Sequence, residues 1–254
     1  LINAREEYDR PDIRLPKAQT ALLDAAAAAN ESTLLYLVTG YPFAINKEKD
    51  TAKAVLCSTH LGPCLGHVAA ATVFGENNPA GRTPTTWYRS VRDLPALDDY
   101  DIAKNHVTYL YFRGKPLYAF GYGLSYTTFE YSNLTLDKSE MKDTDTLTVS
   151  VNVRNTGKVK GKEVVQLYVA KPESRTIRPI KELRGFEKVE LEPGEEKTVT
   201  FTLAKRAFAY YRTDISDWYV ESGDYTIMAA KSSRDIACTA TVNVTSTTQI
   251  KRVY

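Results

Sequence analysis

Cysteine, net charge and long apolar runs are all scarce in this chain. The three cysteines, Cys57, Cys64 and Cys238, are few and odd in number, so we expect no disulfide framework. The apolar tract Ala25–Ala29 is far shorter than the roughly 20 residues that span a bilayer. A net charge of +2, from 33 basic and 31 acidic residues, gives no broad attraction for polyanions. We therefore expect neither nucleic acid nor a membrane as partner.

The rest of the composition is that of an ordinary globular protein. Hydrophobic residues make up 43% and charged residues 25% of the 254 positions, a length that suits two domains. The chain begins at Leu1 rather than Met, and we expect that its true N-terminus is missing or processed. Secreted, periplasmic and cytoplasmic locations all stay open.

The first half reads as alternating helices and strands. Residues Lys17–Asn30 have helical spacing, with Pro16 suited to the first turn and Asn30 to the C-terminal cap. The run Leu34–Val38 predicts a strand buried on both faces, and Ala54–Cys57 repeats this pattern. A second helix is expected over Leu65–Phe74, ended by Gly75. This order predicts a layered α/β unit.

The pattern changes near Tyr131, and from Leu147 to Val153 apolar residues alternate strictly with polar ones. Turn sequences such as Asn155-Thr156-Gly157 and Glu192-Pro193-Gly194-Glu195 separate the alternating segments. About seven short strands with such turns predict an immunoglobulin-like β-sandwich. The resulting domains are residues 1–135 and 136–254. Strands are expected at Leu147–Val153, Val164–Val169, Gly185–Leu191, Val199–Leu203, Tyr225–Ala229 and Cys238–Val244.

Three motifs do not follow from helix or strand patterning. They are Glu6-Glu7-Tyr8-Asp9-Arg10, Asn78-Pro79-Ala80-Gly81-Arg82 and the aromatic and glycine-rich run Tyr118–Phe129. As a set they resemble the C-terminal half of a glycoside hydrolase family 3 enzyme. This resemblance implies part of the family's α/β sandwich domain followed by a fibronectin type III-like domain. It also implies hydrolysis of terminal β-D-glucosyl or β-xylosyl residues, with retention of configuration and without a cofactor.

The resemblance assigns a catalytic role to Glu6. In the family motif the corresponding glutamate is the general acid/base, whereas the nucleophile is an aspartate on a barrel domain that nothing in this chain resembles. Retaining hydrolysis needs two carboxyl groups roughly 5–5.5 Å apart, so Glu6 would supply one of them. We therefore expect a barrel-bearing segment or chain as partner, a glycoside or oligosaccharide as substrate, and no activity from this chain alone. A solvated charged loop is the alternative interpretation of the motif, and Glu7 replaces a glycine of the family pattern.

Four other side chains are candidates for lesser roles. Arg10 is expected to form a local ion pair with Asp9 and is a candidate for substrate contact. Arg82 is expected to anchor backbone carbonyls or a carboxylate. Trp87 and Tyr122 could stack on sugar rings, but packing is the preferred explanation of each ring taken singly.

Two alternatives complete the sequence-based interpretation. Cys57, His60, Cys64 and His67 have spacings found in zinc sites, but a strand end and a helix start need not bring them together, and we expect no metal. A non-catalytic carbohydrate-contact or scaffold module is the alternative to an enzyme.

Overall fold

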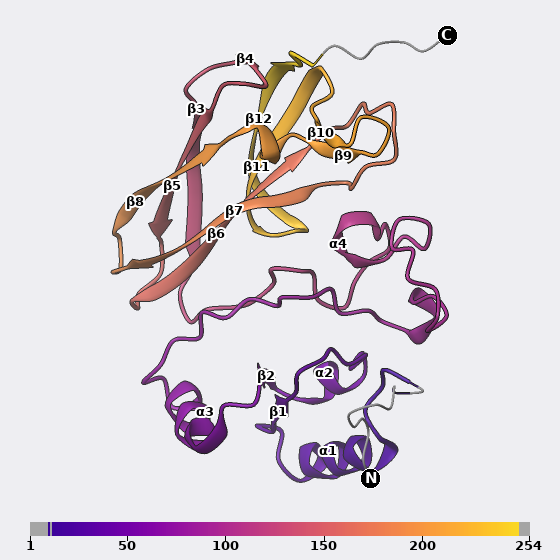
Figure 1. Cartoon of the computed structure of the whole chain (residues 1–254). Coiled ribbons are helices and arrows are strands. Elements are labelled where there is room, and N and C mark those ends of the chain that lie inside the picture. Colours follow the sequence, from indigo (N-terminus) through magenta and orange to yellow (C-terminus); the bar gives the residue numbers. More distant parts are fainter. Residues whose placement is uncertain (1–9, 11, 249–254) are drawn as a thin grey trace. The chain divides into compact units, whose positions relative to one another are not determined.

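The computed structural model describes residue 10 and residues 12–248, which form two compact units (Figure 1). Each unit combines segments that are separate in the sequence. The first contains the described residues up to Asn77, together with Pro84–Thr108 and Phe112–Ala119. The second contains Asn78–Thr83, Tyr109–Tyr111 and the chain from Phe120 onward.

The first unit has the predicted alternation of helices and strands. Strands β1 and β2 pair in parallel, with Leu34 opposite Ala54 and Val38 opposite Ser58. Helix α1 begins after Pro16 and ends before Asn30, and α3 ends before Gly75, whose φ of +83° favours glycine. Helices α1 and α3 and strands β1 and β2 were predicted from the sequence. The elements are α1 (Lys17–Ala29), β1 (Leu34–Val38), α2 (Glu48–Thr51), β2 (Ala54–Ser58) and α3 (Leu65–Val73). The short helix α4 (Thr108–Tyr111) begins with Thr108 of this unit, and its residues Tyr109–Tyr111 belong to the second unit. Short 3-10 turns cover Gly62–Cys64 and Val91–Asp93.

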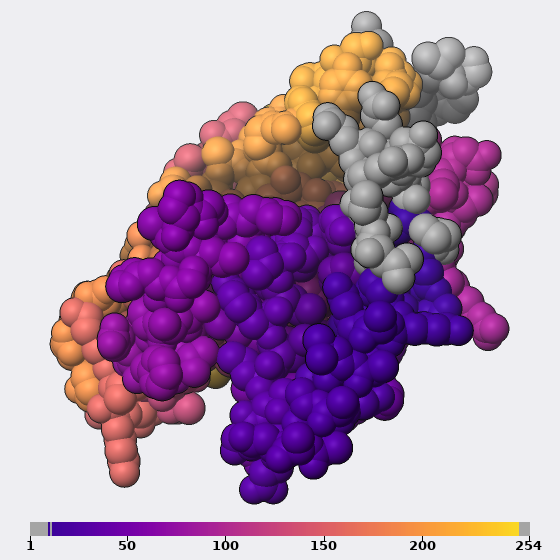
Figure 2. Space-filling model, turned by 90° about the horizontal axis from the view of Figure 1, so that it is seen from below, coloured from indigo at the N-terminus to yellow at the C-terminus, as the bar shows by residue number. Residues whose placement is uncertain are grey.

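The prediction that β1 is buried on both faces is wrong within the described chain. Only Leu37 of this strand is buried, and Leu34 and Val38 at its ends are exposed. The reason is that β2 is the only described strand that pairs with β1. Helix α3 shows the same feature, because its largely apolar sequence buries only Thr72. The indigo to purple surface of this unit faces the viewer in Figure 2.

The core of the first unit lies beside β1 and includes residues from loops on either side. Leu37 packs there with Phe43 and Ile45 from the loop that follows β1. Trp87 and Leu117 approach from later in the sequence, and backbone hydrogen bonds between Trp87 and both Leu117 and Tyr118 hold these segments together. A smaller cluster contains Tyr88, Val107 and Phe112.

The second unit is a β-sandwich. One sheet has the order β4-β12-β11-β6-β7 and the other the order β3-β5-β8, while β9 and β10 form a separate ribbon (Figure 1). The strands are β3 (Phe129–Leu136), β4 (Glu140–Lys142), β5 (Leu147–Asn155), β6 (Gly161–Ala170), β7 (Glu182–Leu191), β8 (Glu196–Leu203), β9 (Tyr210–Arg212), β10 (Asp217–Tyr219), β11 (Gly223–Ser232) and β12 (Asp235–Thr245). A 3-10 turn covers Lys205–Ala207.

Alternation places the sandwich core as predicted. In β5, Leu147, Val149, Val151 and Val153 are fully buried, while the residues between them are partly exposed or exposed. All six predicted strands are present in longer form, whereas β3, β4, β9 and β10 were not predicted. All of β3 lies in the second unit, and the predicted domain boundary after residue 135 falls near the end of this strand. Among the described helices, none is long and apolar enough to cross a membrane.

Candidate functional site

The predicted acid/base, Glu6, lies outside the described residues, as do Glu7 and Asp9. Its assignment therefore stays a prediction, and so does the ion pair between Asp9 and Arg10. The described end of this motif is Arg10.

Arg10 is attached to the loop that follows β1. Its Nη1 and Nη2 atoms donate to the carbonyl oxygen of Pro42 at 3.1 and 3.2 Å. The guanidinium also lies over the rings of Tyr41 and Phe43, 3.9 and 5.1 Å from their centroids. Burial lowers the pKa of Arg10, with the charge of Tyr41 acting in the opposite direction. The motif therefore ends beside the carboxyl end of a parallel strand, the edge at which open α/β sheets bind ligands.

The two aromatic candidates for sugar contact have different environments. Trp87 is buried, with 5% of its surface exposed, and its ring meets the edge of Tyr118 at 5.7 Å. Tyr122 is partly exposed, and its backbone N–H donates to Thr83 Oγ1 at 3.0 Å. The indole of Trp87 is thus packed against protein atoms in this chain. Sugar stacking by either ring stays a prediction.

The part of the aromatic and glycine-rich run that belongs to the second unit, residues 120–129, lies in close contact with β6 and with the segment Asn78–Thr83. Gly121 has φ +80°, and Gln166 Nε2 donates to its carbonyl oxygen at 3.0 Å. A Cβ atom on Gly123 would lie 2.2 Å from the carbonyl oxygen of Gly81. These glycines allow the loop to lie directly against β6 and the segment Asn78–Thr83. The two glycines of the motif are therefore explained by the close packing of this loop.

Asn78 connects three parts of this region. Its Oδ1 accepts hydrogen bonds from Ser125 Oγ at 3.0 Å and from the backbone N–H of Tyr126 at 2.8 Å. Its Nδ2 donates to the carbonyl oxygen of Lys160 at 3.0 Å. One side chain thus joins the motif at residues 78–82 to the aromatic run and to the residue that precedes β6.

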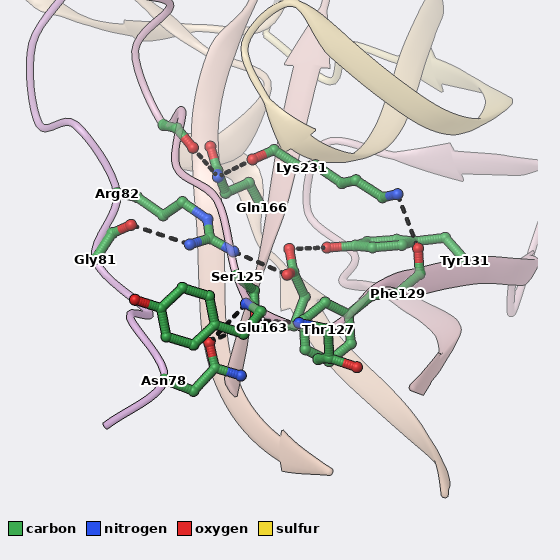
Figure 3. Close-up of polar contacts among 12 residues, drawn as sticks. Asn78, Gly81, Arg82, Ser125, Thr127, Phe129, Tyr131, Glu163, Gln166 and Lys231 are labelled. Atoms are coloured by element: carbon green, nitrogen blue, oxygen red, sulfur yellow. Dashed lines mark hydrogen bonds and ion pairs between the residues drawn. The ribbon is translucent and has the colours of Figure 1, made fainter. Parts of the chain in front are cut away.

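A buried charged network lies at the centre of the same region (Figure 3). Arg82 Nη2 contacts Glu163 Oε2 at 2.8 Å, and Arg82 Nη1 donates to the carbonyl oxygen of Gly81 at 3.0 Å. The Tyr131 hydroxyl donates to the other carboxylate oxygen of Glu163 at 2.9 Å. The predicted anchoring of a carbonyl and a carboxylate by Arg82 is confirmed.

Burial dominates the electrostatics of this network. The side chains of Arg82 and Glu163 are 9% and 3% exposed. Burial raises the pKa of Glu163, with the charge of Arg82 and the hydroxyl of Tyr131 acting to lower it. Burial and the neighbouring carboxylate also raise the pKa of Tyr131 far above its ordinary value, so this phenol stays protonated and donates. The network therefore holds a fixed guanidinium, carboxylate and phenol in a site largely closed to water.

Sequence reasoning missed Glu163, Tyr131 and Gln166. One signal was present, because Glu163 stands in phase with Val165 and Leu167, whose side chains point into the sandwich. A charged residue at an inward position of a strand requires a partner. Nothing in the local sequence indicated that this partner would be Arg82, 81 positions earlier.

The predicted absence of a metal concerned Cys57, His60, Cys64 and His67. Cys57 and Cys64 are exposed residues with free thiols, although partial burial of the Cys57 thiol raises its pKa. Within residue 10 and residues 12–248, no group of three or more His, Cys, Asp or Glu side chains could hold a metal ion.

Comparisons with known proteins place both units in one family. Residues 2–126 match the glycosyl hydrolase family 3 C-terminal domain, and residues 163–233 match the fibronectin type III-like domain. The thermostable beta-glucosidase B of Acetivibrio thermocellus is 45% identical over 98% of this chain and 34% of its own length. The exo-alpha-(1->6)-L-arabinopyranosidase of Bifidobacterium breve is 38% identical over 93% of this chain and 32% of its own length.

A solved structure agrees with these sequence matches. The GH3 beta-glucosidase of Bifidobacterium adolescentis superposes with a TM-score of 0.87 at 35% identity, over 94% of this chain and 37% of that chain. This chain spans about a third of the length of the curated relatives it matches. It belongs to glycoside hydrolase family 3, of which it carries the C-terminal α/β domain and the fibronectin type III-like domain.

Proposed function

We propose that this chain is the C-terminal part of a retaining β-glycosidase that releases terminal β-D-glucosyl or β-xylosyl residues. Membership of glycoside hydrolase family 3 supports the reaction class, and several relatives carry the names of β-glucosidases or a putative β-xylosidase. A barrel-bearing segment or chain supplies the nucleophile and most of the sugar-binding surface. We propose that the chain alone does not turn over substrate.

The exposed apolar surface of the first unit is the observation that carries this proposal. Its parallel sheet has only two described strands, and Leu34 and Val38 of β1 remain exposed. Val68, Val73 and Phe74 at α3 are 36%, 50% and 81% exposed. Parallel sheets normally have both faces covered, and contiguous exposed apolar surface marks an interaction site. Further strands from the remainder of a family 3 enzyme would cover these residues.

Glu6 is the proposed general acid/base. In the first step it would donate a proton to the leaving glycosidic oxygen while an aspartate of the barrel attacks the anomeric carbon. In the second step its carboxylate would take a proton from the water that hydrolyses the glycosyl-enzyme intermediate. The attachment of Arg10 to Pro42 supports this role, because it ties the end of the motif to the ligand-binding edge of the sheet. Arg10, Trp87 and Tyr122 are the proposed candidates for sugar contact.

The test combines this chain with a barrel-bearing segment and uses chromogenic β-glucosides and β-xylosides. An α-L-arabinopyranoside is included because one relative is named for that activity. We expect turnover from the mixture and none from the chain alone. Glu6→Ala should abolish most turnover, and azide or a substrate with a good leaving group should restore part of it.

Glu7→Ala is the matched control for this experiment. Glu7 is adjacent and equally acidic, but the family pattern has glycine at its position, so its removal should leave most of the turnover intact. Equal losses in the Glu6 and Glu7 variants, or full activity of Glu6→Ala, would contradict the acid/base role. Binding of an oligosaccharide without turnover in any mixture would favour the alternative, a non-catalytic carbohydrate-contact or scaffold module.

A further inference from the structure

The second unit contains a glutamate, Glu163, whose side chain is almost completely buried. Glu163 on β6 is 3% exposed, and its two carboxylate oxygens contact the side chains of Tyr131 and Arg82. A buried carboxylate without a cation is strongly unfavourable, because it loses its hydration and gains no opposing charge. A cation at this position therefore stabilises the charged form of Glu163.

The other cation in the neighbourhood does not take this place. Lys231 on β11 donates its Nζ proton to the carbonyl oxygen of Phe129 at 2.8 Å and lies 5.8 Å from the ring centroid of Tyr131 (Figure 3). Its charge acts on Glu163 only over a longer distance. Arg82 is thus the cation in direct contact with this carboxylate.

Two separated acceptors match the planar fork of a guanidinium. Nη2 of Arg82 reaches Glu163, while Nη1 reaches the carbonyl oxygen of Gly81. A lysine ammonium offers a single nitrogen and lacks the planar pair of nitrogens that meets these two acceptors. The position is therefore suited to guanidinium rather than to any cation.

Neighbouring contacts hold the backbone around this position. Gln166 Nε2 donates to the carbonyl oxygens of Gly121 at 3.0 Å and Lys231 at 2.7 Å. Asn78 fixes the other end of the segment Asn78–Thr83 through Lys160 and Ser125. The receiving surface is thus built from several strands and does not depend on Arg82 alone.

We propose that the sandwich carries a guanidinium-binding site, formed by Glu163 and Tyr131, and that Arg82 is its resident ligand. The segment Asn78–Thr83 is then held on the sandwich as a peptide ligand supplied by the same chain. The ligand class is an alkylguanidinium cation, with arginine as the natural member. A site of this kind should accept a small guanidinium when the arginine side chain is removed.

The test is chemical rescue of the full chain carrying Arg82→Ala. We expect its melting temperature to fall below that of the wild type, and millimolar ethylguanidinium chloride to raise it again in proportion to the logarithm of concentration, as binding to the folded state requires. Ethylammonium chloride at equal concentration should have a clearly smaller effect. The double variant Arg82→Ala/Glu163→Gln should show no rescue, because it lacks the carboxylate.

A rescue of equal size by ethylammonium, or in the double variant, would overturn the proposal. If Arg82→Ala does not fold, Arg82→Lys replaces it as the test, because lysine keeps the charge and loses the fork. We expect Arg82→Lys to melt below the wild type, and an unchanged melting temperature would overturn the guanidinium preference. The measurement uses no enzymatic activity, so its failure would leave the proposed glycosidase function untouched.

Discussion

Gly121 and Gln166 approach each other so closely that a Cβ atom on Gly121 would lie 2.0 Å from Gln166 Oε1. The same amide holds the loop, because Gln166 Nε2 donates to the carbonyl oxygen of Gly121 and Gln166 Oε1 accepts from the Tyr168 hydroxyl at 2.6 Å. Gln166 is 3% exposed, so it has little room to move away. Two independent features therefore favour glycine at position 121: its positive φ angle and the absence of space for a Cβ atom beside Gln166.

Gly121→Ala should therefore destabilise the chain by more than its backbone angle alone predicts. Gly194→Ala is the matched control, because Gly194 has nearly the same φ, +79° against +80°, but open space around the missing Cβ atom. We expect about 1–2 kcal/mol for Gly194→Ala from left-handed strain. Overpacking against Gln166 should bring Gly121→Ala to about 2–5 kcal/mol. Urea unfolding measures both values, and equal losses would show that contact with Gln166 costs nothing.

Gly66→Ala should have the opposite effect. Gly66 lies in α3, its φ is not positive, and a Cβ atom there would meet nothing within 4 Å. Alanine restricts the unfolded chain and favours the helix, so we expect a gain of about 0.5 kcal/mol. The same urea titration tests this prediction. A loss of stability would mean that the N-terminal turn of α3 is not helical in solution.

The parts of the fold that were predictable from sequence are those with strong local patterns. Pro16 and Asn30 bound α1, Gly75 follows α3, and the alternation of β5 persists over its whole length. Strand β3 was missed for a physical reason. Its pairing with β5 shifts register between Ser132 and Thr135, and Asn133 there has φ +52°, which interrupts the alternation.

The candidate site was less predictable, because its partners are far apart in sequence. The anchoring role of Arg82 followed from its residue type, but the identity of Glu163 as its partner depends on tertiary structure. The exposure of β1 could not be predicted either. The apolar sequence of Leu34–Val38 indicates that the strand requires burial, but it does not identify the element that covers it. Local sequence patterns thus indicate that a segment must be buried or that a charge must be paired, whereas the residues that bury or pair it are known only from the tertiary structure.

Asn155→Ala should be strongly destabilising, because this side chain satisfies four backbone or side-chain groups. Asn155 is fully buried, and its Nδ2 donates to the carbonyl oxygens of Val159 and Leu191. Its Oδ1 accepts from Thr127 Oγ1 and from the backbone N–H of Gly157. Removing the amide leaves buried groups unpaired, at a cost of about 2–3 kcal/mol.

Asn152→Ala is the control for this substitution. Asn152 lies on the same strand, but its hydrogen bonds to Glu196 and Thr198 are exposed and can be replaced by water. We expect a change within about 0.5 kcal/mol. Melting temperatures that fall equally in the two variants would indicate that the loss comes from the strand position and not from the buried hydrogen bonds.

Glu163 should give the stability of the chain a distinctive pH dependence. Burial raises the pKa of this carboxyl above its ordinary value of 4.5, against the effects of Arg82 and Tyr131. The folded state then binds the proton more tightly than the unfolded state between 4.5 and the raised pKa. This contribution to stability is fully present below 4.5 and is lost as the pH rises through the raised value.

Glu163→Gln removes this titration, so the stability of the wild type relative to the variant should be greatest at low pH and should decrease as the pH rises. Urea unfolding of both proteins between about pH 4 and about pH 8 measures the difference. Glu130→Gln, the same substitution at an exposed position on β3, is the control for the loss of one carboxyl group. A wild-type advantage that instead grows with pH would mean that the ion pair with Arg82 and the hydrogen bond from Tyr131 stabilise the carboxylate by more than burial disfavours it.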